Sequence, residues 1–369
     1  MRVLILGGYG EFGSRLARLL ADEPGVDLMI AGRSLAKART MAERLGAVAV
    51  AVDRDGDLAA ALMALKPDVV VDVSGPFQAY GDVPYRVVEA AIDAGADYLD
   101  LADATEFVAG ISSLDARAKA AGRVALSGLS TLPALSFAVV RRLAADMDVL
   151  ESLEIGVAPS PKAPLGLSVV AATASYAGES VRRLQNGRVV DGVGLAEARR
   201  WTIAPPGTRP MRRRLFVLAD APDLALAPQV WPGLKTVWTG AGPAPQGALW
   251  LLRLVAWLRH RKLAPPLAPS APFFHWVINA LRWGEDRGGM IVEARGLRGG
   301  QRVARTWSLI AEGEDGPFIP AMAAAVVIRQ MTSGRGPSPG ARPAMRELDL
   351  ADFEALFALR RIVCGLSGA

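Results

Sequence analysis

The chain has 369 residues, of which 51% are hydrophobic and 21% charged, a composition that excludes intrinsic disorder and predicts about two folded domains. Its 42 lysines and arginines exceed its 37 acidic residues by 5, and because this excess is spread along the chain, we expect no nucleic-acid partner. The single cysteine, Cys364, and the two histidines exclude a disulfide framework and a cysteine-based zinc site, so we expect no metal.

The expected location follows from two features of the sequence. The first residues already read as a core strand, so we expect no signal peptide before it. No uncharged apolar run reaches the roughly 18 residues that a membrane-spanning helix needs. A cytoplasmic, soluble protein is therefore expected, with association at a membrane surface left open.

A glycine-rich turn follows the first apolar run. Val3–Leu6 reads as a strand buried on both faces, and Ser14–Leu20 has a helical pattern. The residues between them spell G-x-G-x-x-G, in which the glycines permit a tight turn, close approach of a pyrophosphate and packing of the helix on the strand. This pattern predicts a dinucleotide site. The expected cofactor contacts here are Gly8, Tyr9, Gly10, Glu11, Phe12 and Gly13.

The end of the second predicted strand, residues 27–31, favours NADP over NAD. Sites for NAD usually carry an acid at this position, which binds the 2′-hydroxyl of the ribose. Here Arg33 and Ser34 follow the strand, and Lys37 comes one helical turn later. Two cations and a hydroxyl suit a 2′-phosphate, and cations at a helix start are unfavourable unless an anion offsets them. We therefore predict NADP as the cofactor, with NAD the less favoured alternative.

Apolar strands and helical segments alternate as far as residue 127, which predicts an α/β fold with a doubly wound, parallel Rossmann sheet. Ligands of such sheets bind beyond the carboxyl ends of the strands. The third strand ends at Asp53, which we assign to the cofactor site. A loop rich in glycine and proline follows the fourth strand, and we expect it to lie beside the nicotinamide. Its expected cofactor contacts are Ser74, Gly75, Pro76 and Phe77.

Three stretches resemble one known family. They are VSGPFQAYG at 73–81, VVEAAIDAGADYLDLAD at 87–103 and the turn GLSTLP at 128–133. Together they resemble the saccharopine dehydrogenase-like oxidoreductases, and residues 311–329 and 340–357 resemble that family's closing segment. The resemblance implies an N-terminal NADP-binding Rossmann domain and a second α+β domain inserted before a final helical return. The family includes saccharopine-forming reductases and enoyl reductases that act on lipid chains.

From these observations we predict three segments. Residues 1–140 form the Rossmann domain, and residues 141–315 form an α+β domain for substrate binding or dimerisation. Residues 316–369 form C-terminal helices that return to the Rossmann domain, with a flexible linker at 333–343. Within the second domain, Asn186-Gly187 predicts a turn, and the glycines at 299–300 predict a hairpin. We also expect a homodimer.

Residues 247–284 are unusually apolar and aromatic. They contain four tryptophans, two phenylalanines and flanking cations, with a proline-rich break in the middle. The pattern predicts a helical hairpin. Its role is left open between packing inside the protein, a lid or dimer surface, and contact with a membrane interface.

No motif identifies a proton donor. None of the five tyrosines has a lysine four residues later, which disfavours the short-chain dehydrogenase pair. The candidates by position are Tyr80, Asp100 and Tyr176, with Lys162 as an outside choice. Each has a structural alternative, since Tyr80 can brace its loop, Asp100 can cap the next helix, and the other two can face solvent.

The sequence thus predicts an NADP-dependent oxidoreductase that transfers hydride to or from a small or lipid-like carbonyl, imine or enoyl substrate. Saccharopine itself bears several carboxylates and would need convergent arginines, whereas the middle of this chain is apolar and aromatic. The alternative is a non-catalytic NADP-binding module that senses redox state or anchors a partner at a membrane.

Overall fold

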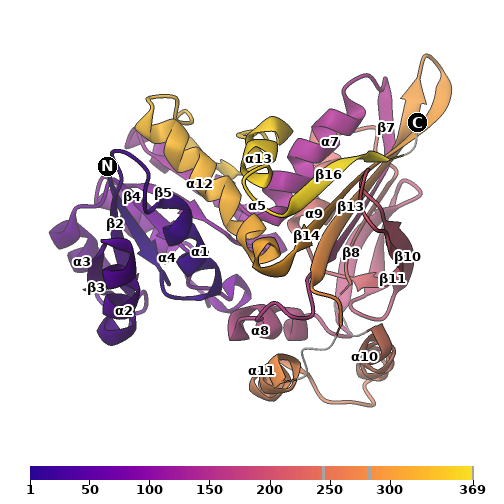
Figure 1. The fold of residues 1–369 in the computed structure, drawn as a ribbon, viewed down its shortest axis with the longest axis horizontal. Helices are drawn as coiled ribbons and strands as arrows, with labels where there is room; N and C mark the ends of the chain where they lie inside the picture. The colour runs from indigo at the N-terminus through magenta and orange to yellow at the C-terminus, as the bar shows by residue number, and fades with distance from the viewer. Residues whose placement is uncertain (243–245, 281–283, 368–369) are drawn as a thin grey trace. The chain divides into compact units, whose positions relative to one another are not determined.

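In the computed structural model, residues 1–242, 246–280 and 284–367 are described. The chain divides into two units, which we call the first and the second unit (Figure 1). The first unit consists of residues 1–134 and 318–348, and the second of residues 135–317 and 349–369.

The first unit is built on a seven-stranded, all-parallel sheet in the order β15-β6-β5-β4-β1-β2-β3. The strands are β1 (Arg2–Leu6), β2 (Asp27–Gly32), β3 (Val48–Ala51), β4 (Val69–Asp72), β5 (Asp97–Asp100), β6 (Val124–Ser127) and β15 (Gly340–Pro343). The chain runs outward from β1 in one direction to β3 and then returns to β4 on the other side of β1. The switch point between β4 and β1 is where sheets of this kind bind ligands.

Helices cover the sheet because its central strands are apolar on both faces. They are α1 (Glu11–Leu20), α2 (Leu35–Leu45), α3 (Leu58–Leu65), η1 (Phe77–Ala79), α4 (Arg86–Asp93), α5 (Thr105–Gly110), η2 (Ile111–Leu114), α6 (Asp115–Ala120) and α12 (Ile319–Thr332). Residues 3–5 of β1 have no exposed surface. α12 packs against α1, and the Arg329 guanidinium donates to the Glu23 carboxylate at 2.6 Å and to the Leu19 carbonyl at 2.8 Å. The doubly wound sheet predicted from the sequence is confirmed.

The segment predicted to return to the Rossmann domain divides between the units. α12 and β15 belong to the first unit, whereas α13 (Leu350–Phe357) and β16 (Ile362–Ser367) belong to the second. The predicted linker at 333–343 also ends in a strand, since the Gly340 amide donates to the Arg123 carbonyl at 2.9 Å and β15 pairs with β6. β15 has only four residues and ends in a proline, so it carries no strand pattern that a sequence reading detects.

The second unit contains a seven-stranded mixed sheet in the order β10-β11-β12-β7-β13-β14-β16. Besides β16, its strands are β7 (Val149–Ala158), β10 (Ala198–Ile203), β11 (Met211–Leu218), β12 (Thr236–Ala241), β13 (Arg287–Arg298) and β14 (Gln301–Glu312). The β12–β7 pair is parallel and the other pairs are antiparallel. The predicted turn at 299–300 joins β13 to β14, and that at 186–187 joins the separate hairpin of β8 (Ser180–Gln185) and β9 (Arg188–Val193).

The remaining helices belong to the second unit, except that the short η3 and η5 each cross its border. They are η3 (Thr131–Leu135), α7 (Ser136–Ala144), α8 (Leu167–Ser175), α9 (Pro222–Val230), α10 (Gln246–His260), η4 (Ala268–Ser270), α11 (Ala271–Ala280) and η5 (Gly313–Phe318). The helical hairpin predicted at 247–284 is α10 followed by α11, although its residues 281–283 lie outside the described part. Among the described residues, no helix combines the length and hydrophobicity needed to cross a bilayer.

Candidate cofactor site

The glycine turn after β1 is shaped by backbone contacts that leave no room for side chains. A Cβ on Gly13 would overlap the carbonyl oxygen of Gly7 and lie 2.8 Å from the Gly8 Cα atom, so α1 begins directly against the turn. A Cβ on Gly10, in contrast, would meet only the Gly7 carbonyl oxygen, at 3.0 Å. The space around that position is otherwise open, which is where a pyrophosphate approaches in sites of this kind.

The start of α1 offers backbone donors to an anion. Gly10 is the N-cap and supplies no side-chain acceptor, so the first amides of the helix, which have no carbonyl partner within it, remain available. The Glu11 carboxylate in this first turn pairs with the Arg15 guanidinium at 2.6 Å. This ion pair offsets the negative charge that would otherwise oppose a phosphate. Phe12 is half-buried beside it.

The residues predicted to select the cofactor lie next to the turn. The Ser34 amide donates to the Tyr9 hydroxyl at 3.0 Å, and the Tyr9 ring lies so close to Gly32 that a Cβ there would come within 2.7 Å of the hydroxyl oxygen. Ser34 is the N-cap of α2 and accepts from the Lys37 amide at 3.4 Å.

The cations at the start of α2 have no acidic partner. The side chains of Arg33 and Lys37 are exposed, and neither forms an ion pair within the described part of the chain. The first turn of α2 also contains no acid. Two unpaired cations at the positive end of a helix provide the charge that a 2′-phosphate requires.

The loop after β4 borders the glycine turn on its other side. A Cβ on Gly7 would lie 2.8 Å from the Val73 carbonyl oxygen and 3.1 Å from the Ser74 Cα atom. The structure therefore brings the predicted contacts at 74–76 to the switch point of the sheet. The Phe77 side chain is buried and stacks on Tyr80 with the ring centroids 4.9 Å apart, so it anchors the loop.

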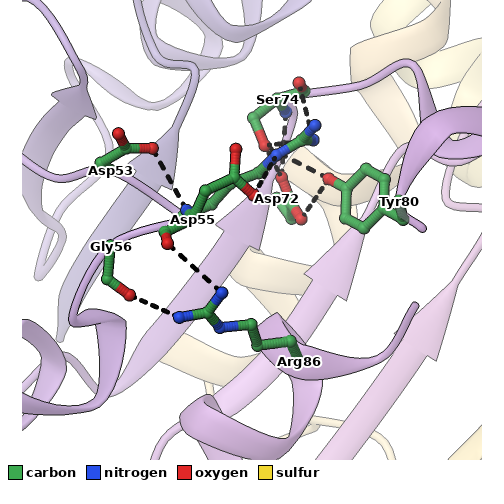
Figure 2. A network of polar contacts seen from close by, with 8 residues as sticks. Asp53, Asp55, Gly56, Asp72, Ser74, Tyr80 and Arg86 are labelled. Carbon is green, nitrogen blue, oxygen red and sulfur yellow. Dashed lines mark hydrogen bonds and ion pairs between the residues drawn. The ribbon is translucent and has the colours of Figure 1, made fainter. Parts of the chain in front are cut away.

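Asp53 orders the loop after β3. Its Oδ1 atom accepts from the Asp55 amide at 3.1 Å, and the carboxylate is exposed (Figure 2). Arg86 fixes the same loop by donating to the carbonyls of Asp55 and Gly56, at 3.3 and 2.6 Å. The sequence-predicted role of Asp53 in cofactor binding stays a prediction.

A buried polar network supports the loop after β4, and the sequence reading missed its centre, Asp72. Figure 2 shows the side chains of Ser74 and Tyr80 directed at this carboxylate, which has no exposed surface. Tyr80 donates to its Oδ2 atom at 2.7 Å, while the hydroxyl and amide of Ser74 donate to its Oδ1 atom at 2.6 and 2.9 Å. The signal in the sequence is the acid that ends the run of three valines in β4.

Arg54 was also missed. Its guanidinium donates to the Ser74 carbonyl at 3.1 Å and lies 4.1 Å from the centre of the Tyr80 ring. It thereby links the loop after β3 to the loop after β4. No sequence pattern marks this contact, because it joins residues that only the folded sheet brings together.

The electrostatics of the network favour a structural role for Tyr80. Burial raises the pKa of Asp72, and hydrogen bonds from Ser74 and Tyr80 oppose that rise. Burial and the neighbouring Asp72 carboxyl raise the pKa of Tyr80, so its hydroxyl stays protonated and is held by Asp72. A phenol in this state braces the loop and is a poor general base.

Asp100 also has a structural position. It has no exposed surface, and its Oδ1 atom accepts from Ala102, Ser127 and Gly128 at 2.9, 3.0 and 2.7 Å. These bonds fasten the end of β5 to the turn after β6. Burial raises the pKa of Asp100 to about 7. It does not cap α5, whose N-cap is Ala104.

The other two candidate proton donors come from the other unit. Tyr176 and Lys162 belong to the second unit, where the Tyr176 side chain is half-buried at the end of α8 and Lys162 is exposed. Among the described residues, no group of three histidine, cysteine, aspartate or glutamate side chains is placed to hold a metal ion.

Comparison with known families agrees with this geometry. Residues 3–126 match the family model described as the saccharopine dehydrogenase NADP binding domain. Residues 3–126, which make up most of the first unit, are thus similar to the NADP-binding domain of saccharopine dehydrogenases. This confirms the family resemblance and the cofactor predicted from the sequence.

The whole chain is similar in fold to a solved enzyme. Saccharopine dehydrogenase (L-Glu forming) from Saccharomyces cerevisiae matches over 100% of both chains, with a TM-score of 0.69 and 16% sequence identity. DAP dehydrogenase from C. glutamicum has a TM-score of 0.46 and 18% identity, over 96% of this chain and 98% of its own. No curated protein sequence matches the chain.

Proposed function

We propose that the chain is an NADP-dependent oxidoreductase that acts on a lipid-like carbonyl, imine or enoyl compound. The observation that carries this proposal is the meeting of three elements at the switch point of the first sheet. They are the open space at Gly10, the unpaired cations Arg33 and Lys37, and the loop that begins at Ser74. The residues present fit an NADP molecule because they supply backbone donors, cations and an unobstructed turn.

Each element has a distinct task. The first amides of α1 would bind the pyrophosphate, and Arg33, Ser34 and Lys37 would bind the 2′-phosphate. The loop at 74–76 would border the nicotinamide, which supplies or accepts the hydride when the cofactor is bound. Asp72 holds that loop in place through Ser74 and Tyr80. A rigid loop keeps the reacting carbon in one position relative to a substrate.

The proposed substrate class rests on the second unit. Its α10 and α11 expose tryptophan, phenylalanine and leucine side chains. Exposed apolar side chains of this kind are more in keeping with an enzyme that meets its substrate in or at a lipid phase than with one that binds a small polycarboxylate. The likeness to saccharopine dehydrogenase concerns the fold and does not extend to the substrate.

A screen of NADPH oxidation tests the proposal. Aldehydes, ketones, enoyl thioesters and pairs of an amine with a 2-oxo acid would each be offered in a short-chain and a long-chain form. We expect oxidation of NADPH, faster than that of NADH, with a long-chain member of one class. Oxidation restricted to small polar imines would contradict the lipid-like substrate. Tight NADPH binding without oxidation in any class would favour the non-catalytic module.

A further inference from the structure

We propose that α10 and α11 form a surface that docks on an anionic lipid bilayer. We call it the aromatic surface and define it by its exposed apolar side chains. They are Trp250, Leu251, Leu254, Trp257, Leu263, Phe273, Trp276 and Ile278. The proposal concerns where the protein resides and does not depend on the reaction that it catalyses.

The first half of the aromatic surface comes from a helix that is apolar on two sides. The inner side of α10 carries Leu249 and Ala256, which are buried against a core cluster that includes β11. The outer side carries Trp250 and Trp257, whose exposed fractions are 53% and 46%, with Leu254 between them. A helix at the surface of a globular protein normally carries polar residues on its outer side. The outer side of α10 is therefore built to meet an apolar phase.

α11 repeats the arrangement. Its Ala271 and Phe274 pack on α8, whereas Phe273 and Trp276 are 61% and 67% exposed. Asn279 fastens this helix to the loop before α8, because its side chain accepts from the Leu165 amide at 3.2 Å and donates to the Leu165 carbonyl at 3.0 Å.

The two halves are joined through Leu267, which packs against the core clusters under both helices. The exposed side chains consequently belong to fixed elements of the second unit. An ordered apolar surface of this kind marks an interaction site.

The charges around the aromatic surface indicate the partner. Between Asp223 and Glu285 the sequence contains no acidic residue. Glu179 pairs with Arg259 of α10 at 2.9 Å, whereas Arg261 and Lys262 are exposed at the end of the helix. Cations also stand over the exposed rings, since the guanidiniums of Arg253 and Arg261 lie 4.7 and 5.4 Å from the ring centres of Trp250 and Trp257. Tryptophans flanked by cations are typical of helices that lie in the interface of anionic membranes.

Two other occupants fit less well. A two-fold dimer through this surface would bring the same cations of both copies together, and the segment offers no carboxylate to offset them. A membrane-spanning arrangement needs about 20 residues per helix, whereas α10 has 15. An anionic bilayer surface can bury the apolar side chains and attract the cations.

Vesicle flotation of the full chain tests the proposal. Vesicles of phosphatidylcholine alone would be compared with vesicles that also contain phosphatidylglycerol. We expect the protein to float with the anionic vesicles, to remain at the bottom with the neutral ones, and to be released by salt. Failure to float with anionic vesicles would overturn the proposal.

Matched variants locate the binding surface. Trp257→Ala/Trp276→Ala and Arg261→Gln/Lys262→Gln should each weaken binding about tenfold or more, from lost apolar area and lost attraction to the lipids respectively. The control Leu359→Ala removes an apolar side chain elsewhere that is more exposed than either tryptophan, and Arg18→Gln/Arg44→Gln removes two exposed cations from the first unit. Both controls should float as the parent does. Equal losses in controls and test variants would contradict the assignment.

NADPH affinity and circular dichroism establish that each variant is folded, and they are independent of vesicle binding. The oligomeric state provides the last discriminating result. If the parent is a dimer that Trp257→Ala/Trp276→Ala converts to a monomer, and neither floats, the aromatic surface is a contact between copies. If NADPH oxidation is absent for all substrates but flotation is observed, the membrane proposal stands and the proposed function fails.

Discussion

The hydroxyl of Tyr9 accepts a hydrogen bond from the amide of Ser34 at 3.0 Å and so joins the glycine turn to the start of α2. The contact fixes the pyrophosphate-binding turn relative to the residues that select the cofactor. Because Arg33 immediately precedes Ser34, its guanidinium starts from a defined backbone position. Cofactor preference should therefore depend on side-chain charge at this point rather than on loop rearrangement.

Arg33→Asp should reverse the preference for NADP. The change removes a cation and places a carboxylate where the 2′-phosphate would lie, so NADP affinity should fall about tenfold to a hundredfold while NAD affinity changes little. Dissociation constants for both cofactors can be measured by fluorescence or calorimetry. Arg39→Asp, on the opposite flank of α2 from Lys37, is the control and should leave the ratio unchanged. An equal effect of Arg33→Asp on the two cofactors would refute the assignment.

Two glycine substitutions separate folding from binding. Gly13→Ala should destabilise the first unit, because the added Cβ overlaps the Gly7 carbonyl. Gly10→Ala should lower the thermal midpoint much less than Gly13→Ala, since its Cβ meets a single atom at 3.0 Å, but should weaken NADP binding at least about tenfold by obstructing the pyrophosphate. Unfolding curves and cofactor affinities measure the two effects. A Gly10→Ala variant with normal affinity would show that phosphates bind elsewhere.

Tyr80→Phe tests the bracing role. It removes a donor from the buried Asp72 carboxyl and should lower the free energy of unfolding by about 1–3 kcal/mol. Tyr85→Phe is the matched control, since that hydroxyl donates to the Phe107 carbonyl at 2.8 Å and should cost about 1 kcal/mol. Chemical denaturation gives both values. If Tyr80→Phe leaves stability unchanged but abolishes turnover, Tyr80 is a proton donor instead.

The buried Asp100 predicts a pH dependence of stability. Its pKa is raised from 3.8 to about 7 in the folded state, so between these values the folded chain binds more protons than the unfolded chain. Stability should therefore fall as the pH rises through this window and then level off. Asp100→Asn should reduce this slope, because an amide does not titrate, while Asp223, whose pKa burial also raises to about 7, keeps its own contribution.

Asp115→Asn provides the contrast for this measurement. A hydrogen bond with Lys119 lowers the pKa of Asp115 in the folded state. The contribution of Asp115 to stability is therefore present above the ordinary pKa of an aspartate and is lost as the pH falls. Replacing Asp115 should leave the slope between pH 4 and 7 unchanged. Unfolding midpoints measured between pH 4 and 7 give the slope for each of the two variants, Asp100→Asn and Asp115→Asn. An unaltered slope in Asp100→Asn would mean that Asp100 is ionised throughout.

The parts of the site that the sequence predicted are those encoded locally. The turn at 8–13 and Arg33 each follow a strand that is recognisable from its own residues. The same holds outside the site, where Asn186-Gly187 forms the expected hairpin turn with positive φ at both residues. Asp72 and Arg54 were missed because their roles arise from contact between two loops that are distant in sequence. The strand β15 was missed because its residues, Gly-Ala-Arg-Pro, carry no apolar or alternating pattern, unlike the valine-rich β4 of the same length. The strand β16 was missed because it forms by pairing with β14, which is distant in sequence.

The homodimer and the membrane association stay predictions, each with its own measurement. Light scattering after gel filtration gives the number of copies in solution. A dimer that persists in Trp257→Ala/Trp276→Ala would place the contact outside the aromatic surface.

Transfer of deuterium from C4-deuterated NADPH to a substrate is the most direct test of the central claim. We expect a long-chain carbonyl, imine or enoyl compound to acquire one deuterium in the presence of the protein, and Gly10→Ala to reduce the transfer in proportion to its lost cofactor affinity. Tight binding of NADPH without deuterium transfer to any compound would contradict an oxidoreductase.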